Sequence, residues 1–278
     1  MNKPGPTAPS PINAADLRSY IESQDDFAFE LDVYQKALER GIQAEHAGLY
    51  EDPVTNKPRQ FDIRVNKAAE SRRISLAIEC KGLAPTFPLL VSCVPRSQGE
   101  SYHEVLYFSE TAAANYSHAR VRAQTGGRWL YRPGEPVGKQ MRQVRRDSKG
   151  ELTGGDEVFD KWMQALASAG DLVTGGAKEV SRRQGGRARF VAILPILVVS
   201  DDTLWVANYQ ADGRVAGDPS SVDEITFYLG RKYTLSREAT SFTISHLHIY
   251  TRRHIPTLFD QIAGGGAIWS QVFDLGEN

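Results

Sequence analysis

Residues 190–200 read FVAILPILVVS, the strongest signal in the chain for a buried strand. Residues 74–80 read ISLAIEC and are likewise mostly apolar. A strand with one face in water alternates apolar and polar residues, whereas a strand covered on both faces reads as a near-continuous apolar run. The two runs therefore predict an α/β protein whose mixed central sheet is flanked by helices on both sides.

Apolar spacing and turn residues predict the elements around these two strands. A helical region runs from about residue 14 to 40 with a break near 23–26, and Gly41 is placed to end it. Further helices are expected at residues 156–169 and 255–263. Further strands are expected at residues 42–50, 60–66, 88–94, 204–209, 224–229 and 242–250. The strand at 204–209 is expected to pair with the run at 190–200 through a turn at 201–202.

At 278 residues the chain is long enough for one elaborated domain. We expect a flexible tail at residues 1–12, a single domain at 13–263 and a C-terminal tail at 264–278. Within the domain, the core is expected at residues 26–94 and 156–209. An insertion at 97–155 and a strand-rich C-terminal extension at 210–263 elaborate it.

The composition is that of a soluble globular protein, with 41% hydrophobic and 24% charged residues. Its net charge of -1 gives no global attraction to a polyanion, so any nucleic-acid affinity requires a local basic surface. Cys80 and Cys93 fit no zinc or redox spacing. No apolar run approaches the roughly 18 residues that span a bilayer. We expect a cytoplasmic protein without a membrane partner.

Two acids and a lysine stand at the ends of two consecutive expected strands. Asp62 lies at the start of one strand, and Glu79 and Lys81 lie at the end of the next. Residues two apart in a strand share a face, so Glu79 and Lys81 are expected on the same side. A structural ion pair at the strand end, with Asp62 as a turn residue, is the plain alternative.

These residue types fit the hydrolysis of a phosphodiester. Carboxylates supply the oxygen ligands that Mg²⁺ prefers, and Mg²⁺ keeps several waters and binds phosphate oxygens. The cation offsets charge on the phosphorus and lowers the pKa of a bound water. A lysine beside that water could orient it or contact the phosphate.

The spacing of Asp62, Glu79 and Lys81 resembles the PD-(D/E)xK signature of restriction-endonuclease-like nucleases and Holliday-junction resolvases. Glu30 heads an amphipathic helix that ends at Gly41, and a strand and a polar hairpin loop separate that helix from Asp62. This is similar to the helix-hairpin-strand order of the superfamily. The resemblance covers residues 26–94, and we extend it to the helix at 156 and the strand at 190. It departs from the pattern at Phe61, where the signature has proline, and at Gln60, where many relatives carry a further acid.

The resemblance implies a restriction-endonuclease-like core that hydrolyses phosphodiester bonds in DNA with Mg²⁺ or Mn²⁺, in defence, repair or recombination. Asp62 and Glu79 would bind the metal and Lys81 would position the attacking water. Glu30 matches a helix glutamate that adds a ligand in the superfamily, although the helix dipole alone also favours an acid there. Whether the chain acts as a homodimer or with a partner subunit stays open.

The insertion concentrates positive charge on an otherwise neutral chain. Between residues 116 and 150 it carries nine basic residues against only Glu135 and Asp147, with Trp129 and Tyr131 interleaved. Arginines hold phosphates and aromatic rings stack on bases, so we expect nucleic acid to bind here. The candidate contacts are Arg120, Arg122, Arg128, Arg142, Arg145 and Arg146. A solvated loop, or a docking site for another acidic partner, is the alternative.

Two other classes of function compete with the nuclease. One is a nucleic-acid-binding module that keeps the fold without cleaving, and the other is a protein-interaction subunit. The presence of Asp62, Glu79 and Lys81 together favours the enzyme.

Overall fold

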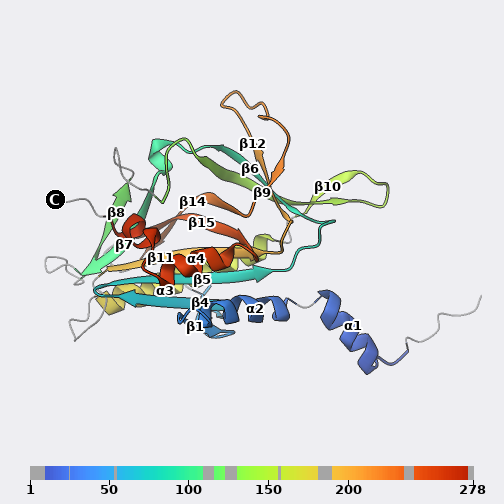
Figure 1. Ribbon diagram of the computed structural model, residues 1–278, viewed down its shortest axis with the longest axis horizontal. Coiled ribbons are helices and arrows are strands. Elements are labelled where there is room, and N and C mark those ends of the chain that lie inside the picture. The colour runs from blue at the N-terminus through green and yellow to red at the C-terminus, as the bar shows by residue number, and fades with distance from the viewer. Residues whose placement is uncertain are drawn as a thin grey trace, which may run out of the picture.

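The computed structural model describes residues 10–24, 26–52, 55–108, 116–122, 130–155, 158–180, 190–234 and 241–274. They form an α/β protein with a large mixed sheet flanked by helices, as the sequence predicts (Figure 1). The helices are α1 (Ala14–Gln24), α2 (Phe27–Leu38), α3 (Phe159–Val180), α4 (Ile255–Ala263) and α5 (Ala267–Phe273), with a short 3-10 turn at Gln98–Glu100. Among the described residues, no helix has the length and apolar character to cross a bilayer.

The described strands divide into one sheet of thirteen and a separate two-stranded hairpin. The large sheet contains β1 (Gln43–His46), β4 (Ile63–Ala69), β5 (Arg72–Lys81), β6 (Leu89–Pro95), β7 (Tyr102–Phe108), β8 (Tyr116–Arg122), β9 (Pro136–Arg146), β10 (Leu152–Gly155), β11 (Phe190–Val199), β12 (Leu204–Asn208), β13 (Ser220–Ser221), β14 (Glu224–Thr234) and β15 (Ser241–Thr251). The hairpin is β2 (Leu49–Glu51) with β3 (Pro58–Gln60).

Strands β1, β4, β5 and β11 lie side by side in that order, and β15 follows β11. β4 runs antiparallel to β1 and β5, whereas β11 runs parallel to β5. Pairing of β11 with β15 begins at Ile196, one residue beyond Pro195, which has no amide to donate. The parallel pair β5 and β11 is joined through a long connection that includes α3, as parallel neighbours require.

The two faces of β5 pack against different helices. Ile74, Leu76 and Ile78 belong to the apolar cluster of α2, α4 and α5. Ala77, on the opposite face, packs in the cluster of α3. The side chains from Ile74 to Cys80 are all buried, which confirms the expectation that this strand is covered on both faces.

The helical region and most strands appear where the sequence predicts them. The helix break lies between α1 and α2, and Gly41 follows α2 with a φ of 63°. The strand expected at 42–50 is instead two strands, because Ala47 takes a φ of 56° and turns the chain between β1 and β2. Of the flexible tail expected at 1–12, residues 1–9 lie outside the described residues, and residues 10–12 are exposed and form no helix or strand.

Two expectations about the second half were wrong. β12 does not pair with β11 but runs parallel to β6, and β15, β14 and β9 stand between β11 and β6 in the sheet order. Residues 267–273 form the helix α5, whose Trp269 and Val272 are buried, so this segment is not a tail. β15, in the stretch expected as a C-terminal extension, is the direct neighbour of β11, so that this stretch completes the central sheet. Within the insertion, β7 pairs with β11, and β9 pairs with β6 and β14.

We expect Gly138 to be required where β9 meets its two neighbours. A Cβ at this position would lie 2.6 Å from Val91 Cγ1 on β6 and 2.8 Å from Phe227 Cδ2 on β14. Gly138→Ala should therefore lower the free energy of unfolding by about 1–3 kcal/mol, the usual cost of overpacking a core. Urea unfolding measures it, with Gly99→Ala as control because its added Cβ would meet only Ser97 Oγ at 3.9 Å. Equal midpoints for both variants would contradict this assignment.

Candidate active site

Asp62 and Glu79 face each other across the antiparallel pair of β4 and β5. Ile63 is paired with Ile78, so Asp62, one residue earlier, comes opposite Glu79, one residue later. The backbone amide of Asp62 donates to Glu79 Oε1 at 3.4 Å, and the amide of Cys80 donates to Asp62 Oδ2 at 2.8 Å. The structure therefore brings together the two acids that the sequence proposed as a pair.

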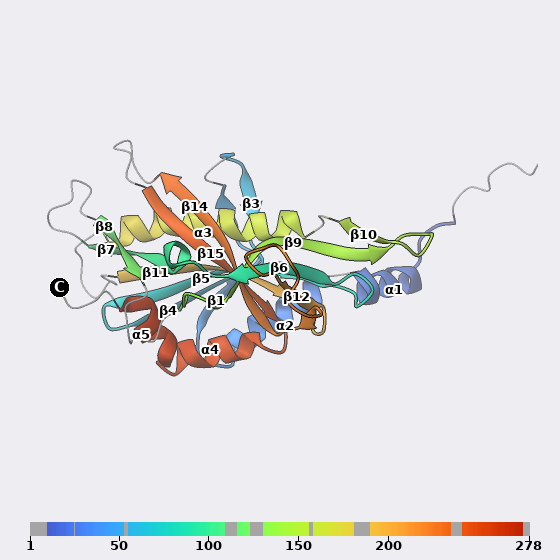
Figure 2. The same cartoon turned by 90° about the horizontal axis from the view of Figure 1, so that it is seen from above.

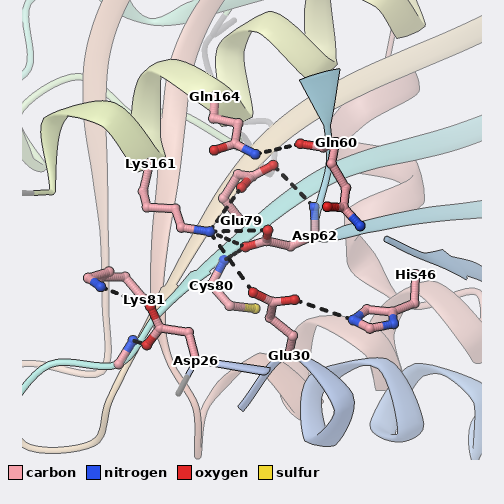
Figure 3. A network of polar contacts seen from close by, with 11 residues as sticks. Asp26, Glu30, His46, Gln60, Asp62, Glu79, Cys80, Lys81, Lys161 and Gln164 are labelled. Carbon is pink, nitrogen blue, oxygen red and sulfur yellow. Dashed lines mark hydrogen bonds and ion pairs between the residues drawn. The ribbon is translucent and has the colours of Figure 1, made fainter. Parts of the chain in front are cut away.

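The cation between these acids is Lys161, in the first turn of α3. Its Nζ lies 2.9 Å from Asp62 Oδ2 and 3.1 Å from Asp62 Oδ1. It also lies 3.6 Å from Glu79 Oε2 (Figure 3). Figure 3 shows Lys161 reaching from the helix over the strand pair. Its ion pairs with Asp62 and Glu79 therefore connect α3 to the sheet.

Glu30 supplies a third carboxylate from the first turn of α2. Its Oε1 lies 4.0 Å from Lys161 Nζ, and its Oε2 lies 3.3 Å from Nε2 of His46 on β1. The rings of Phe27 and Tyr34 lie against that imidazole, with centroids at 5.5 and 5.6 Å. Glu30 thus faces the two strand carboxylates, as the resemblance implies, and His46 holds its outer oxygen.

Lys81 lies at the rim of this cluster. Its Nζ donates to Asp26 Oδ2 at 2.8 Å, and the amide of Gly82 donates to Asp26 Oδ1 at 2.8 Å. Asp26 directly precedes α2 and meets the end of β5, which draws Lys81 towards it. From the sequence, Lys81 was expected to face Asp62 and Glu79. In the structure Lys161 lies there instead.

Burial sets the electrostatics of the cluster. The pKa of Glu79 is raised well above its ordinary value, mainly by burial and then by the charge of Asp62, with Lys161 acting against both. Burial and Asp62 also raise the pKa of Glu30. For Lys161, burial alone would lower the pKa, but Asp62 and Glu79 outweigh it and the pKa is raised. The site therefore favours a cation near these acids.

A cleft of about 360 Å³ opens onto the cluster, and Glu30, Asp62, Lys161 and Gln164 are among the residues that line it. Glu79 Oε2 is buried and accepts no hydrogen bond from the described residues. Within the described ranges, no three His, Cys, Asp or Glu side chains form a group ready to hold a metal ion. The carboxylates are hard oxygen donors of the type that Mg²⁺ prefers, so they suit a divalent cation once the ammonium has moved.

Sequence reasoning missed Lys161, Asp26 and His46. The helix expected at 156–169 contains Lys161, but its apolar stripe indicates only which face of the helix is buried. One signal was present: a lysine in the first turn of a helix lies at the end where the dipole disfavours a cation. Such a lysine needs acids nearby, and Asp62 and Glu79 were expected close together with only Lys81 as counter-charge.

The candidate nucleic-acid contacts fall in two places. Arg142 and Arg145 are exposed on β9, and Arg146 on the same strand donates to the carbonyl of Gly150 in the turn to β10. Arg120 and Arg122 lie on β8, at the opposite end of the long axis from the β9–β10 hairpin (Figures 1 and 2). Arg128 lies outside the described residues.

Glu79 should make the stability of the metal-free protein depend on pH. A carboxyl whose pKa is raised in the folded state binds its proton more tightly there, so stability falls as pH rises above the ordinary value of 4.5. Glu79→Gln removes the charge, so its melting temperature in chelator at pH 8 should exceed that of the wild type. Each kcal/mol recovered raises it by about 2–4 °C.

The advantage of Glu79→Gln should shrink as the pH approaches 4.5, where the wild-type carboxyl is protonated. The exposed Glu151→Gln is the matched control and should show no such dependence. A lower melting temperature for Glu79→Gln at pH 8 would contradict the electrostatic picture.

Comparison with known proteins found no matching family model, no matching curated protein and no matching solved structure. Membership of the PD-(D/E)xK superfamily therefore stays a prediction from the sequence. The geometry of Asp62, Glu79, Glu30 and Lys161 is the observation on which a function can be argued.

Proposed function

We propose that this protein is a metal-dependent nuclease that hydrolyses phosphodiester bonds, with DNA as the substrate that the family resemblance implies. One observation carries the proposal. Carboxylates from α2, from the residue before β4 and from β5 converge on Lys161 beside one cleft, and one oxygen of the buried Glu79 accepts no hydrogen bond from the described residues. Burying charge in this way is costly, so such a cluster indicates a site for a cation.

Asp62, Glu79 and Glu30 are the residues that would hold Mg²⁺ or Mn²⁺. When bound, the metal would offset charge on the phosphate and lower the pKa of a water. Each carboxylate is also held by a contact from a neighbouring backbone amide or side chain. The amide of Cys80 holds Asp62, the amide of Asp62 holds Glu79, and His46 holds Glu30. Such supporting contacts keep ligands in place while a substrate arrives.

The two lysines would have different tasks. Lys161 lines the cleft, so its ammonium can donate to a phosphate oxygen or orient the attacking water. Lys81 is held at the rim by Asp26 and could contact the backbone of the nucleic acid. The role at the attacking water that the sequence analysis expected of Lys81 is thus given to Lys161.

The topology around the site supports the proposed restriction-endonuclease-like core. Helix α2 is followed by strands β1 to β4 with the β2–β3 hairpin among them, and then by β5, which carries Glu79. This order agrees with the helix-hairpin-strand arrangement that the resemblance implies.

The β9–β10 hairpin is the part of the basic segment that suits substrate binding. It extends from the body at the same end of the long axis as α1, which precedes α2 and Glu30 (Figures 1 and 2). Arg142 and Arg145 are exposed on it. A strand of nucleic acid lying along this end could meet both the arginines and the cleft.

One observation favours a second candidate, a nucleic-acid-binding module that does not cleave. The ammonium of Lys161 already neutralises part of the acidic cluster, so the cluster could be a closed structural ion network. Binding without metal-dependent cleavage would identify this function.

We expect cleavage of plasmid and linear DNA in Mg²⁺ or Mn²⁺, with RNA tested in parallel. Asp62→Asn and Lys161→Met should each reduce the rate by about 100-fold or more, the order of magnitude that one positioned group contributes. Lys81→Met should have a smaller effect because Asp26 holds its ammonium at the rim. The control is Asp160→Asn, an exposed acid on the same helix. Equal cleavage by all variants, or cleavage in chelator, would count against the proposal.

Charge reversal on the hairpin tests the substrate-binding surface. Arg142→Glu with Arg145→Glu should weaken DNA binding and reduce the slope of log K against log salt by about 0.9 for each phosphate that is no longer neutralised. Arg146 is left in place because it bonds the hairpin turn. Lys57→Glu with Lys232→Glu, two other exposed positions, is the matched control. Unchanged affinity and salt slope in the arginine variant would remove the hairpin from the binding surface.

A further inference from the structure

Lys161 occupies an unusual position for a lysine. It lies in the first turn of α3, where the helix dipole disfavours a cation, and its side chain is only 22% exposed. Both costs are offset because carboxylates from three different elements lie within 4.0 Å of its Nζ. The lysine and the acids therefore depend on each other in the metal-free protein.

The two strand acids rely on this ammonium for much of their neutralisation. Within the described part of the chain, backbone amides reach one oxygen of Asp62 and one of Glu79, while Glu79 Oε2 accepts no hydrogen bond although it is fully buried. Electrostatic relief at this oxygen comes from Lys161 at 3.6 Å. A carboxylate buried in this way stays charged only beside a cation.

Contacts other than those of Lys161 hold α3 to the sheet. α3 is fixed to the sheet by Arg64, which donates to the carbonyl of Ser168 at 3.2 Å and pairs with Asp171 at 2.9 Å. Gln164 donates to the carbonyl of Gln60 at 2.5 Å. Since the cleft beside Lys161 is open, rotation of this one side chain is enough to vacate the space among the acids.

We propose that Lys161 is an internal counter-cation that competes with the divalent metal for Asp62, Glu79 and Glu30. In the metal-free protein its ammonium holds the acids together, and on metal binding it swings into the cleft, where it faces the substrate phosphate. This inference rests on the proposed metal-dependent function. It adds that the lysine sets the metal affinity of the site and that metal binding frees its ammonium from the acids for contact with a substrate phosphate.

Titration of Mn²⁺ in the absence of nucleic acid tests the competition. Lys161→Met removes the competing charge, so it should bind Mn²⁺ about tenfold more tightly than the wild type, equivalent to about 1.4 kcal/mol. In chelator its melting temperature should fall below that of the wild type, and Mn²⁺ should restore it. Lys57→Met, an exposed lysine, is the control and should match the wild type in both measurements.

Unchanged or weaker Mn²⁺ binding by Lys161→Met would overturn the competition. A melting temperature lowered equally in chelator and in Mn²⁺ would also overturn it, since the lysine would then be structural. Should Lys161→Met fail to fold, NMR of the wild type with ¹³C-labelled lysine side chains decides, with Lys161→Arg to assign the resonance. Mg²⁺ should shift the Lys161 signal and leave that of Lys57 in place, and an unmoved Lys161 signal would refute the proposal.

The same titration separates this inference from the proposed function. Tighter Mn²⁺ binding by Lys161→Met with no cleavage by the wild type would support the counter-cation and remove the nuclease. Cleavage by the wild type with equal Mn²⁺ affinity in both proteins would support the nuclease and overturn the counter-cation. Absence of Mn²⁺ binding in both proteins would overturn both.

Discussion

Two carboxylates placed opposite each other in a buried strand pair require a cation, and the arrangement of the site follows from that requirement. Asp62 and Glu79 meet because β4 and β5 are antiparallel in a register that sets Ile63 against Ile78. Like charges directly opposite in a sheet repel, and burial increases the cost. The ammonium of Lys161 on α3 offsets this electrostatic cost. α3, the strand pair and α2 therefore contribute side chains to one cluster of charged groups.

The surrounding fold holds that centre rigidly. β5 is buried on both faces and is paired over its whole length with β11, so Glu79 has little freedom. Arg64 fastens α3 to β4, and its guanidinium lies 4.3 Å from the ring centroid of the buried Phe61, next to Asp62. Strand pairing and packing therefore fix the backbone of the site, while Lys161 reaches the acids with a long side chain that lines the cleft. Functional centres that bind an ion commonly combine a rigid frame with such side chains.

The parts of this arrangement that were predictable from the sequence are those encoded by local pattern. Continuous apolar runs predicted the strands β5 and β11, and nearness in sequence with antiparallel order brought Asp62 to Glu79. Lys161 was not predictable in this way, since its helix reaches the site through the tertiary fold. The ion pair of Asp26 with Lys81 was not predictable either, because it depends on where the start of α2 lies relative to the end of β5. The expected partner of β12 was wrong for the same reason, because a non-local neighbour replaced the local one.

The contact between Lys161 and Asp62 joins residues 99 positions apart in the chain. Closing so long a loop costs entropy that is recovered only when the enclosed elements pack together, so contacts of this kind form late in folding. During synthesis on the ribosome, α2, β4 and β5 emerge well before α3. Asp62 and Glu79 therefore have no contact with Lys161 until α3 has been made. A partly synthesised chain therefore has the carboxylates of the site without their ammonium. The site is complete only when α3 packs against the sheet.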